Sequence, residues 1–506
     1  MAPRAAAAGA ALALLRLAAL AHAAPSAVLT SAPQMVYNYT RDHCPRYAPM
    51  PPKRCVPNIL AGCDPDIPDA CTRAWATPAG AYRMLGSVDG VSRAQTGASL
   101  DALAHSCGAP YANATYDPDL AHFRDHEWVE APAVVNASAV YALTHADSID
   151  AAGQYLYTSV TLFASLDGGL SFAPARPPPA HLVATTPYDN TNVSLGVKGA
   201  GFGMPSSILR DPRSGYSYAL LLSSWGQPVR AQRGGLCLLR TPDVTDPGSW
   251  RAWNGSAFAA TLNASPLLGP VADPDAHTCA PLADTSGAPI AMRHLSLLWS
   301  SFYGRFLLFG EAAAGGALNQ TAGWAFALSD DLVRWDPPVR VALAGLLDPA
   351  GNATAQPAAP MPGRFIKTAG SNTMFEAPGA AWKAALGSCT PCPGLDACAL
   401  AVEVPGAEFA GVPNATFAFS CTHVYDVGGY SGYFYSVLVD DAAHRATGAD
   451  PSLNIVGQDA HLFFVAKKCA GVTWDHKAGD AVACTPLDGY GRDQRDIVRA
   501  TIRFGA

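Results

Sequence analysis

Short runs of alternating apolar and polar residues recur along most of the chain, and Gly, Pro, Asn and Asp interrupt them. Helical periodicity is scarce. Alternation with a period of two is typical of β-strands that bury one face, and the four interrupting residue types favour turns. The pattern predicts an all-β chain.

Three segments end in the same way: Ser or Thr and then Asp open a turn, and an aromatic residue closes it. They are Ser165–Phe172, Thr241–Trp250 and Ser329–Trp335. In each case another aromatic residue lies in an apolar run 29 to 32 residues earlier, and these residues are Tyr141, Tyr218 and Phe306. Such a constant interval indicates one structural unit that is repeated.

The first segment is similar to the Asp-box of sialidase-type propellers, and the other two resemble the S-x-D-L-x-x-W turn of glycosidase propellers. In such a turn the aspartate accepts backbone N–H bonds, and the aromatic residue anchors the outer strand. The interval then holds two hairpins and the segment that crosses between them, which describes one four-stranded blade.

Two less complete units begin at Ile67–Leu85 and at Phe375–Trp382, which brings the number to five. We therefore expect residues 64–504 to form a five-bladed β-propeller, with a pair of β-sandwiches or a six-bladed ring as alternatives. The alternating end of the chain, Asp496–Phe504, would pair with an N-terminal blade. Residues 24–63 are rich in Pro and Cys and should form a disulfide-rich lead-in.

Residues 1–23 have the parts of a secretory signal peptide: Arg4, an Ala- and Leu-rich apolar run, and Ala21-His22-Ala23 as a cleavage site. No other run is long enough to span a bilayer, so no membrane span is expected after cleavage. Nine N-x-S/T sequons predict a secreted, extracellular protein that is N-glycosylated. They begin at Asn38, Asn113, Asn136, Asn192, Asn254, Asn263, Asn319, Asn352 and Asn414.

All 13 cysteines follow the signal peptide. Most should form disulfide bonds in an oxidising compartment, and because their number is odd at least one is free or bonded to another molecule. Cys389 and Cys392 have the spacing of a zinc or redox motif. With no second such pair in an exported chain, a disulfide is favoured over a metal site.

The composition excludes one class of partner. Charged residues are 14% of the 506 residues, the formal net charge is −7, and no basic run occurs. A nucleic-acid partner is therefore not expected.

The triplet Arg210-Asp211-Pro212 resembles a signature of invertase-type glycoside hydrolases, in which the aspartate helps to stabilise the transition state. Asp211 precedes Tyr218 by only seven residues, which leaves no room for a strand between them. Asp and Pro opening a turn that Gly closes is a favoured turn sequence. We therefore interpret Asp211 as a turn residue.

The residues that open the first strand of each unit should approach the axis of a propeller. Counting back from the second-strand aromatic gives Asp69, Glu130, Met204, His294 and Glu376, and two of these begin a Glu-Ala-Pro tripeptide. A carboxylate, a small residue and Pro at a strand start resemble the active-site strands of five-bladed glycosidases of the arabinanase, levansucrase and invertase type. Those enzymes carry acidic residues on their first three blades, whereas the third position here is Met204.

The resemblance implies catalytic roles for Asp69, Glu130 and Glu376. Glycoside hydrolysis needs one protonated and one ionised carboxyl group across the scissile bond. Asp69 would be the base or nucleophile, and Glu130 or Glu376 the acid. Arg73 lies on the same strand face as Asp69, so it would keep Asp69 ionised, bind an acidic sugar, or form only a structural ion pair. Further candidates for substrate binding are Trp128, His145, Trp225, Arg293 and His294.

Two functions fit these features. The first is a secreted carbohydrate-active enzyme, a glycoside hydrolase or transglycosidase that uses channel carboxylates and no cofactor, although a calcium ion in the channel stays open. The alternative is a non-catalytic secreted propeller that binds glycans or proteins, because propellers host both functions. Convergence of Asp69, Glu130 and Glu376 on one pocket would distinguish the two.

Overall fold

The structure is a computed structural model. It describes residues 24–31, 34–44, 66, 68–86, 91–108, 112–113, 117, 119–149, 155–189, 200–223, 232–314, 317–341, 364–367, 373–376, 399–403, 416–420, 430–448, 450–468, 471–475, 481–485 and 494–505. Among them the two α-helices are short, four residues in α2 (Tyr39–Asp42) and six in α5 (Ala442–Thr447). The prediction of a chain built mostly from β-strands is confirmed.

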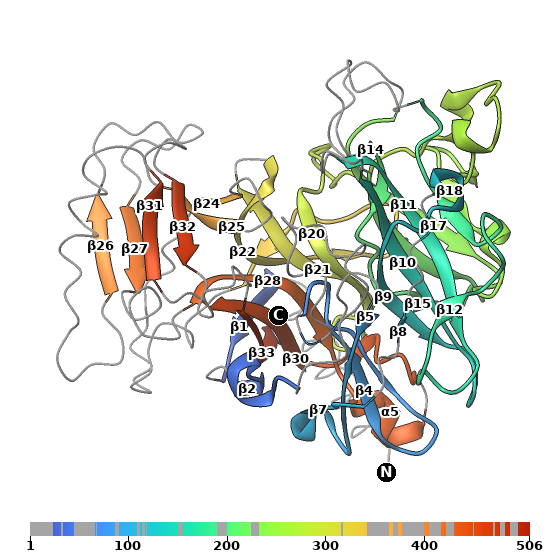
Figure 1. Ribbon diagram of the computed structural model, residues 1–506. Coiled ribbons are helices and arrows are strands. Elements are labelled where there is room, and N and C mark those ends of the chain that lie inside the picture. Colours follow the sequence, from blue (N-terminus) through green and yellow to red (C-terminus); the bar gives the residue numbers. More distant parts are fainter. Residues whose placement is uncertain are drawn as a thin grey trace, which may run out of the picture.

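Most strands belong to five successive arrays, which we call sheets 1 to 5 (Figure 1). Sheet 1 consists of β3 (Ala74–Ala76), β4 (Tyr82–Leu85), β6 (Ala94–Gly97) and β7 (Ala104–His105). Sheet 2 consists of β9 (His126–Val134), β10 (Val140–Ile149), β11 (Tyr155–Ser165), β12 (Ala173–Pro174) and β13 (Leu182–Ala184). Sheet 3 consists of β14 (Ala200–Gly203), β15 (Leu209–Arg210), β16 (Ser217–Ser223), β17 (Gly235–Thr241), β18 (Arg251–Trp253) and β19 (Phe258–Ala260).

A short parallel pairing of β11 with β14 joins sheets 2 and 3 into one 11-stranded sheet. Sheet 4 consists of β20 (Met292–Ser300), β21 (Arg305–Ala314), β22 (Ala317–Ser329) and β23 (Val339–Arg340), with β29 (Ile455–Val456) parallel to β20. Sheet 5 consists of β28 (Tyr430–Val439), β30 (Asp459–Lys468), β33 (Gln494–Gly505) and β1 (Ser26–Leu29), and β2 (Gln34–Tyr37) also pairs with β33.

The remaining strands form two-stranded pairs. They are β24 (Arg364–Lys367) with β25 (Thr373–Glu376), β26 (Ala399–Glu403) with β27 (Thr416–Ser420), β31 (Gly471–Asp475) with β32 (Ala481–Thr485), and β5 (Val91–Ser92) with β8 (Ala112–Asn113).

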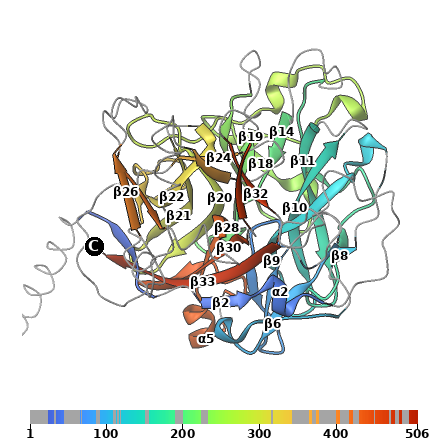
Figure 2. The same ribbon diagram turned by 60° about the vertical axis from the view of Figure 1, so that its left-hand side comes forward.

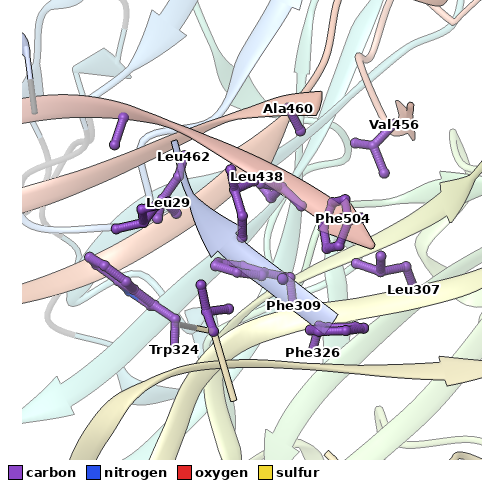
Figure 3. Close-up of a cluster of buried hydrophobic side chains, with 14 of the residues drawn as sticks. Leu29, Leu307, Phe309, Trp324, Phe326, Leu438, Val456, Ala460, Leu462 and Phe504 are labelled. Atoms are coloured by element: carbon purple, nitrogen blue, oxygen red, sulfur yellow. The ribbon is translucent and has the colours of Figure 1, made fainter. Parts of the chain in front are cut away.

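Each of the five sheets packs against two others, and a separate hydrophobic cluster fills each interface. One residue pair represents each cluster: Trp75 with Phe163 (sheets 1 and 2), Leu162 with Phe202 (sheets 2 and 3), Leu238 with Phe306 (sheets 3 and 4), Phe309 with Phe504 (sheets 4 and 5, Figure 3), and Phe463 with Met84 (sheets 5 and 1). Burial of this apolar surface is the main favourable term in folding. The packing is cyclic, because sheet 5 returns to sheet 1.

The constant interval of the sequence has a structural origin. Tyr141 and Phe306 lie on the second strands of sheets 2 and 4, and Tyr218 lies on β16, which pairs with the first strand of sheet 3. The closing aromatics follow β11, β17 and β22 and are buried, as Trp250 and Trp335 illustrate. In the first turn Asp167 accepts hydrogen bonds from the backbone N–H groups of Leu170 (2.9 Å) and Ser171 (3.0 Å).

Asp211 lies in the turn between β15 and β16. Its backbone N–H donates to Tyr216 O, and its carbonyl accepts from Gly215 N, both at 2.9 Å. Its side chain accepts from the backbone N–H of Arg213 at 3.1 Å. The interpretation of Asp211 as a turn residue is confirmed.

The two ends of the described chain meet in sheet 5. Strand β33 pairs with β1 from Ser26↔Gly505 to Leu29↔Ile502, and its other half pairs with β2. Residues expected to form a lead-in thus contribute strands to a sheet. The predicted signal peptide, residues 1–23, lies outside the described residues, and no helix among the described residues is long and apolar enough to cross a membrane.

Disulfide bonds join Cys44 to Cys107 and Cys237 to Cys279. Cys71 is buried with a free thiol. Cys389 and Cys392 lie outside the described residues, so their predicted disulfide stays a prediction.

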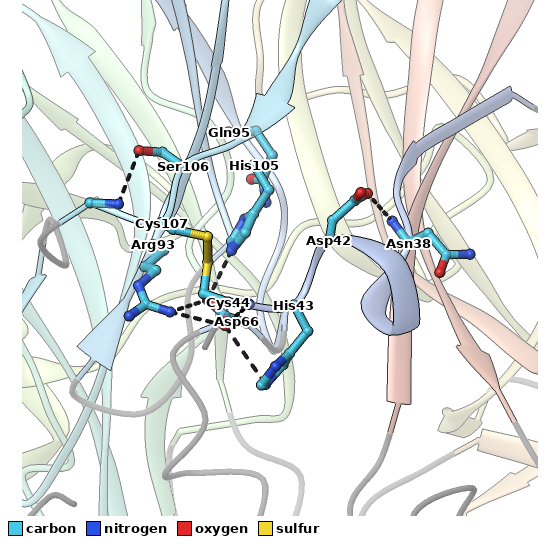
Figure 4. A network of polar contacts seen from close by, with 11 residues as sticks. Asn38, Asp42, His43, Cys44, Asp66, Arg93, Gln95, His105, Ser106 and Cys107 are labelled. Carbon is cyan, nitrogen blue, oxygen red and sulfur yellow. Dashed lines mark hydrogen bonds and ion pairs between the residues drawn. A yellow bond between two sulfur atoms is a disulfide. The ribbon is translucent and has the colours of Figure 1, made fainter. Parts of the chain in front are cut away.

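A buried ion-pair network surrounds the first disulfide (Figure 4). The Asp66 carboxylate, which is 3% exposed, lies 2.8 Å from Arg93 Nη1 and 2.8 Å from His105 Nε2. It also accepts a 2.9 Å hydrogen bond from Cys44 N. Burial alone would raise the pKa of Asp66, but the donors from His105, Arg93 and Cys44 outweigh it and lower this pKa. The network fastens the N-terminal segment to sheet 1.

We expect Asp66→Asn to lower the free energy of unfolding by about 3 kcal/mol at neutral pH, because it leaves a buried guanidinium without its anion. The folded-state pKa of Asp66 is lowered, so its contribution is complete above the unfolded pKa of about 4 and is lost as pH falls through the folded pKa. Urea denaturation of both proteins between pH 3 and 8 measures this difference, which should shrink only at the acid end.

Asp211→Asn is the matched control, since it removes a carboxylate whose partner Arg213 is 55% exposed. This control substitution should lower the free energy of unfolding by about 1 kcal/mol or less. An equal loss of stability in both variants would contradict the structural role of the Asp66 network.

Candidate active site at the centre of the five sheets

The innermost strands bury charged residues. Strands β9 and β20 are buried along almost their whole length, yet β9 carries Glu130 and β20 carries Arg293 and His294. Figure 2 shows β20 and β28, which are in contact, near the middle of the molecule. Because a buried charge is costly unless it is paired, these side chains need partners from neighbouring sheets.

The same backbone irregularity occurs on three innermost strands. The register of β9 shifts between Ala131 and Val129, which leaves Glu130 as an extra residue. Similar shifts occur on β20 and β28, where His294 and Tyr435 have φ angles of 50° and 55°. Bulges re-aim side chains, and positive φ is uncommon for residues other than glycine. Such irregularities concentrate at functional sites.

Asp69 joins sheet 1 to sheet 5. Its Oδ1 is ion-paired with Nη1 of Arg495 on β33 and accepts a 3.2 Å hydrogen bond from the Tyr435 hydroxyl on β28. Burial, followed by the charges of Asp69 and Glu130, raises the pKa of Tyr435 well above its usual value, although Arg495 opposes this. Tyr435 is therefore a neutral hydrogen-bond donor that lies within the influence of both carboxylates.

His145 on β10 lies between two carboxylates of sheet 2. Its Nε2 is 2.9 Å from Asp147 Oδ1, and its Nδ1 is 3.7 Å from Glu130 Oε1. Burial alone would lower the pKa of His145, but the carboxylates of Asp147 and Glu130 outweigh this effect and raise the pKa to about 10. His145 is thus an imidazolium at neutral pH. The other oxygen of Glu130, Oε2, is buried and has no hydrogen-bond partner among the described residues.

A glycine of sheet 3 makes room for this imidazole. A Cβ atom on Gly203 would lie 2.9 Å from His145 Nε2, closer than real side chains approach. The next residue, Met204, has a φ of 49°. The strand start that the sequence analysis assigned to Met204 thus follows a glycine whose backbone lies close to His145.

Glu311 is a carboxylate that the sequence did not indicate. It lies on β21, 3.2 Å from Arg293 Nε and 2.9 Å from His294 Nδ1 through the same oxygen, Oε2. Burial raises the pKa of Glu311, but the charges of His294 and Arg293 outweigh it and lower this pKa. The residue before Glu311 must be a glycine, because a Cβ atom on Gly310 would lie 2.7 Å from the carbonyl oxygen of Arg293.

Arg73 precedes β3 and crosses from sheet 1 to sheets 3 and 4. Its Nη2 donates to the carbonyl oxygens of Pro205 (3.2 Å) and Leu295 (2.7 Å). The predicted contact with Asp69 is therefore wrong, because Asp69 is paired with Arg495. The two residues are near in sequence, but their side chains bind different sheets.

The two predicted tryptophans differ in outcome. Trp128 is 9% exposed, and its ring lies 5.4 Å from the ring of His145 and 6.4 Å from that of His126. It is packed beside the site rather than presented as an open stacking surface. Trp225 lies outside the described residues.

The prediction that Glu376 opens the innermost strand of the last sheet is wrong. Glu376 ends β25, which pairs with β24 outside the five sheets, whereas the innermost strand of sheet 5 is β28. Tyr435, within β28, is the residue of that strand that contacts Asp69. The chain between β23 and β28 adds separate β-pairs, and the Glu-Ala-Pro match gave no sign that it belongs to one of them.

Six of the predicted residues lie in this central cluster: Asp69, Arg73, Glu130, His145, Arg293 and His294. Four residues that were not predicted join them: Asp147, Glu311, Tyr435 and Arg495. Asp147, two residues after His145 on one strand face, could have been found from the period of two. Arg495 and Glu311 have no local signal, since their partners lie on other strands or far along the chain.

Among the described residues one group has a metal-like spacing: Cys44, Asp66 and His105. Cys44 is disulfide-bonded, and Asp66 is bound by Arg93 and His105. These residues serve the structural network described above.

No protein-family model matches the chain, and no curated protein matches it in sequence. Solved structures are similar at low identity. They include an endo-1,5-α-L-arabinanase from Thermotoga petrophila RKU-1 (10% identity, TM-score 0.36, 83% of this chain and 76% of that one) and an α-L-arabinofuranosidase from Lactobacillus brevis (8%, 0.35, 85% and 90%). An N-acetylgalactosamine deacetylase from F. plautii in complex with blood group B trisaccharide is also similar (10%, 0.39, 93% and 95%).

Asp147→Asn should lower the pKa of His145 from about 10, because it removes the carboxylate that lies 2.9 Å from Nε2. The folded pKa of His145 is raised above the unfolded value of about 6.5. The contact with Asp147 therefore stabilises the folded protein fully below pH 6, and this stabilisation is lost as pH rises through 10. NMR titration of the His145 ring carbons measures the shift, and thermal melts at several pH values measure the stability.

His181 is an internal reference for this titration, because burial lowers its pKa to about 3 and it should stay neutral in both proteins. A wild-type His145 that titrates between pH 6 and 7 would contradict the proposed imidazolium.

Proposed function

We propose that this protein is a secreted carbohydrate-active enzyme, a glycoside hydrolase or transglycosidase, which acts with carboxyl groups at the centre of a five-bladed β-propeller. Sheets 1 to 5 would be the blades, with the disulfide-linked N-terminal segment fastened to them. The cyclic packing of five sheets through five hydrophobic clusters supports this architecture.

One observation carries the enzymatic part of the proposal. Asp69 and Glu130 come from different sheets, and both influence the phenol of Tyr435. Glu130 also keeps one buried oxygen without a partner, whereas Asp69 is held by Arg495 and Tyr435. Two carboxyl groups in such unequal surroundings are what acid–base cleavage of a glycosidic bond requires.

The roles follow from these surroundings. Glu130, through Oε2, would donate a proton to the leaving oxygen. Asp69, ion-paired with Arg495, would be the base or nucleophile. His145 and Asp147 would position Glu130, and Glu311 would be a fixed charge held by Arg293 and His294. These steps need neither a metal nor another cofactor.

A non-catalytic propeller that binds glycans or proteins is the second candidate. The burial of the cluster favours it, because Glu130 is only 5% exposed and all four central carboxylates already have an ion-pair partner. In that case the charges would only hold the sheets together.

Glu130→Gln and Asp69→Asn should each lower the turnover of the best substrate by about 10²- to 10⁴-fold, because each removes proton transfer or nucleophilic help at the bond. Ligand binding should largely survive, since both amides keep the shape of the side chain. Turnover on a panel of polysaccharides and aryl-glycosides, together with binding by calorimetry, measures both quantities.

Asp211→Asn is the control, and its activity should stay within a few-fold of wild type because Asp211 lies in a turn away from the cluster. No turnover on any substrate, together with glycan or protein binding that Glu130→Gln leaves intact, would support the non-catalytic function instead.

Secretion would expose the sequons to glycosylation. Asn136 and Asn254 each lie in an exposed turn, where Oδ1 accepts from the N–H and hydroxyl of the serine two residues later. In a eukaryotic secretory host, Asn136→Gln and Asn254→Gln should each remove one glycan. Mass spectrometry before and after enzymatic deglycosylation measures this, and an unmodified, retained wild-type protein would contradict it.

A further inference from the structure

Four arginines are buried among the described residues: Arg73, Arg93, Arg293 and Arg495. Three of them have a carboxylate within ion-pair distance, which is Asp66 for Arg93, Glu311 for Arg293 and Asp69 for Arg495. Arg73 has none among the described residues. A buried charge without a counter-charge is strongly unfavourable, so this exception needs a reason.

The guanidinium of Arg73 is fixed but only partly satisfied. It is 3% exposed, and two hydrogen bonds from Nη2 hold it against the carbonyls of Pro205 and Leu295. Its other nitrogens, Nε and Nη1, are buried and have no hydrogen-bond partner among the described residues. Leu295 lies on β20 next to His294, and Pro205 follows Met204 between β14 and β15, so the guanidinium lies beside residues of the candidate site.

Nearby groups do not supply the missing negative charge. Burial raises the pKa of the Cys71 thiol, so Cys71 is neutral. Glu130 interacts with Arg73 electrostatically but forms no ion pair with it. A protonated Glu130, the form that would donate in catalysis, would leave Arg73 without an ionised partner among the described residues.

We propose that Arg73 binds the carboxylate of an acidic sugar, so that the substrate is a glycan containing uronic acid. This proposal rests on the proposed function, because it uses the same site. A carboxylate carries one negative charge and accepts several N–H bonds, which matches one unpaired guanidinium with unused donors.

The first test uses the wild-type protein and the Glu130→Gln variant. Oligogalacturonides and their carboxyl-reduced counterparts differ only in the carboxylate, and sulfated and phosphorylated oligosaccharides test other anions. Glu130→Gln should bind the oligogalacturonide or another uronate about 10- to 100-fold more tightly than its reduced form in calorimetry, the size expected for a charged hydrogen bond. Wild type should show the same preference in turnover.

The second test asks whether Arg73 causes the preference. Arg73→Gln should reduce the ratio of acidic to neutral binding to about one, and Arg73→Lys should retain part of it. Arg93→Gln is the matched control, because it also removes a buried guanidinium but lies in the Asp66 network. It should lower stability and leave the ratio unchanged.

The outcomes separate this proposal from the proposed function. Glu130-dependent turnover of neutral sugars with no preference for uronates would overturn the role of Arg73 and leave the enzyme proposal intact. A stronger preference for sulfated or phosphorylated sugars would overturn the choice of carboxylate. Absence of both turnover and sugar binding would overturn both proposals. Should Arg73→Gln not fold, the wild-type ratio and Arg73→Lys still decide the matter.

Discussion

The ion pair between Asp69 and Arg495 is the interaction on which the centre of the molecule depends. It joins sheet 1 to β33, the last strand of sheet 5, across 426 residues of sequence. Strand β33 also pairs with β1 and β2, so the beginning and the end of the described chain are held in the same sheet. These contacts act at the same interface as the hydrophobic cluster between sheets 5 and 1, where the cycle of five interfaces closes.

That closure creates an electrostatic constraint. The buried charges at the centre lie on the innermost strands β9 and β20, on the neighbouring strands β10 and β21, on β33 and just before β3, and they have little contact with water. The charges are compensated mainly in pairs or triads that cross between strands or sheets, such as Glu311 with Arg293 and His294. Removing one partner would leave the other buried and unpaired, which is the costly situation. Buried atoms that have no hydrogen-bond partner among the described residues include Oε2 of Glu130 and Nε and Nη1 of Arg73.

Stability and the proposed chemistry make opposite demands on these strands. Regular β-pairing would be more stable than a bulge or a residue with positive φ, yet β20 and β28 contain both, and β9 contains a bulge. The strain is tolerated because the surrounding sheets are buried and well paired. The irregular positions, Glu130, His294 and Tyr435, carry polar side chains that meet at the centre. Departure from local rules at a site of this kind is expected where a fold supports a function.

The sequence by itself determined the β-structure, the repeated interval and the turns. These depend on contacts within a few residues or within one hairpin, as in Asp167 with Leu170 and Ser171 or in the Asp211 turn. It also indicated Asp69, Glu130 and His294, because the spacing from the second-strand aromatic is itself local. It misplaced Glu376, since a tripeptide match does not reveal to which sheet a strand belongs.

Only the tertiary structure decided which charges are paired. Asp69 binds Arg495 rather than Arg73, four residues away, because the two arginines approach the centre from different sheets. Glu311 reaches the same centre from a second strand, where Gly310 allows the backbone to come close. Pairing of buried charges is a three-dimensional balance of distance and desolvation, and no pattern along the chain records it.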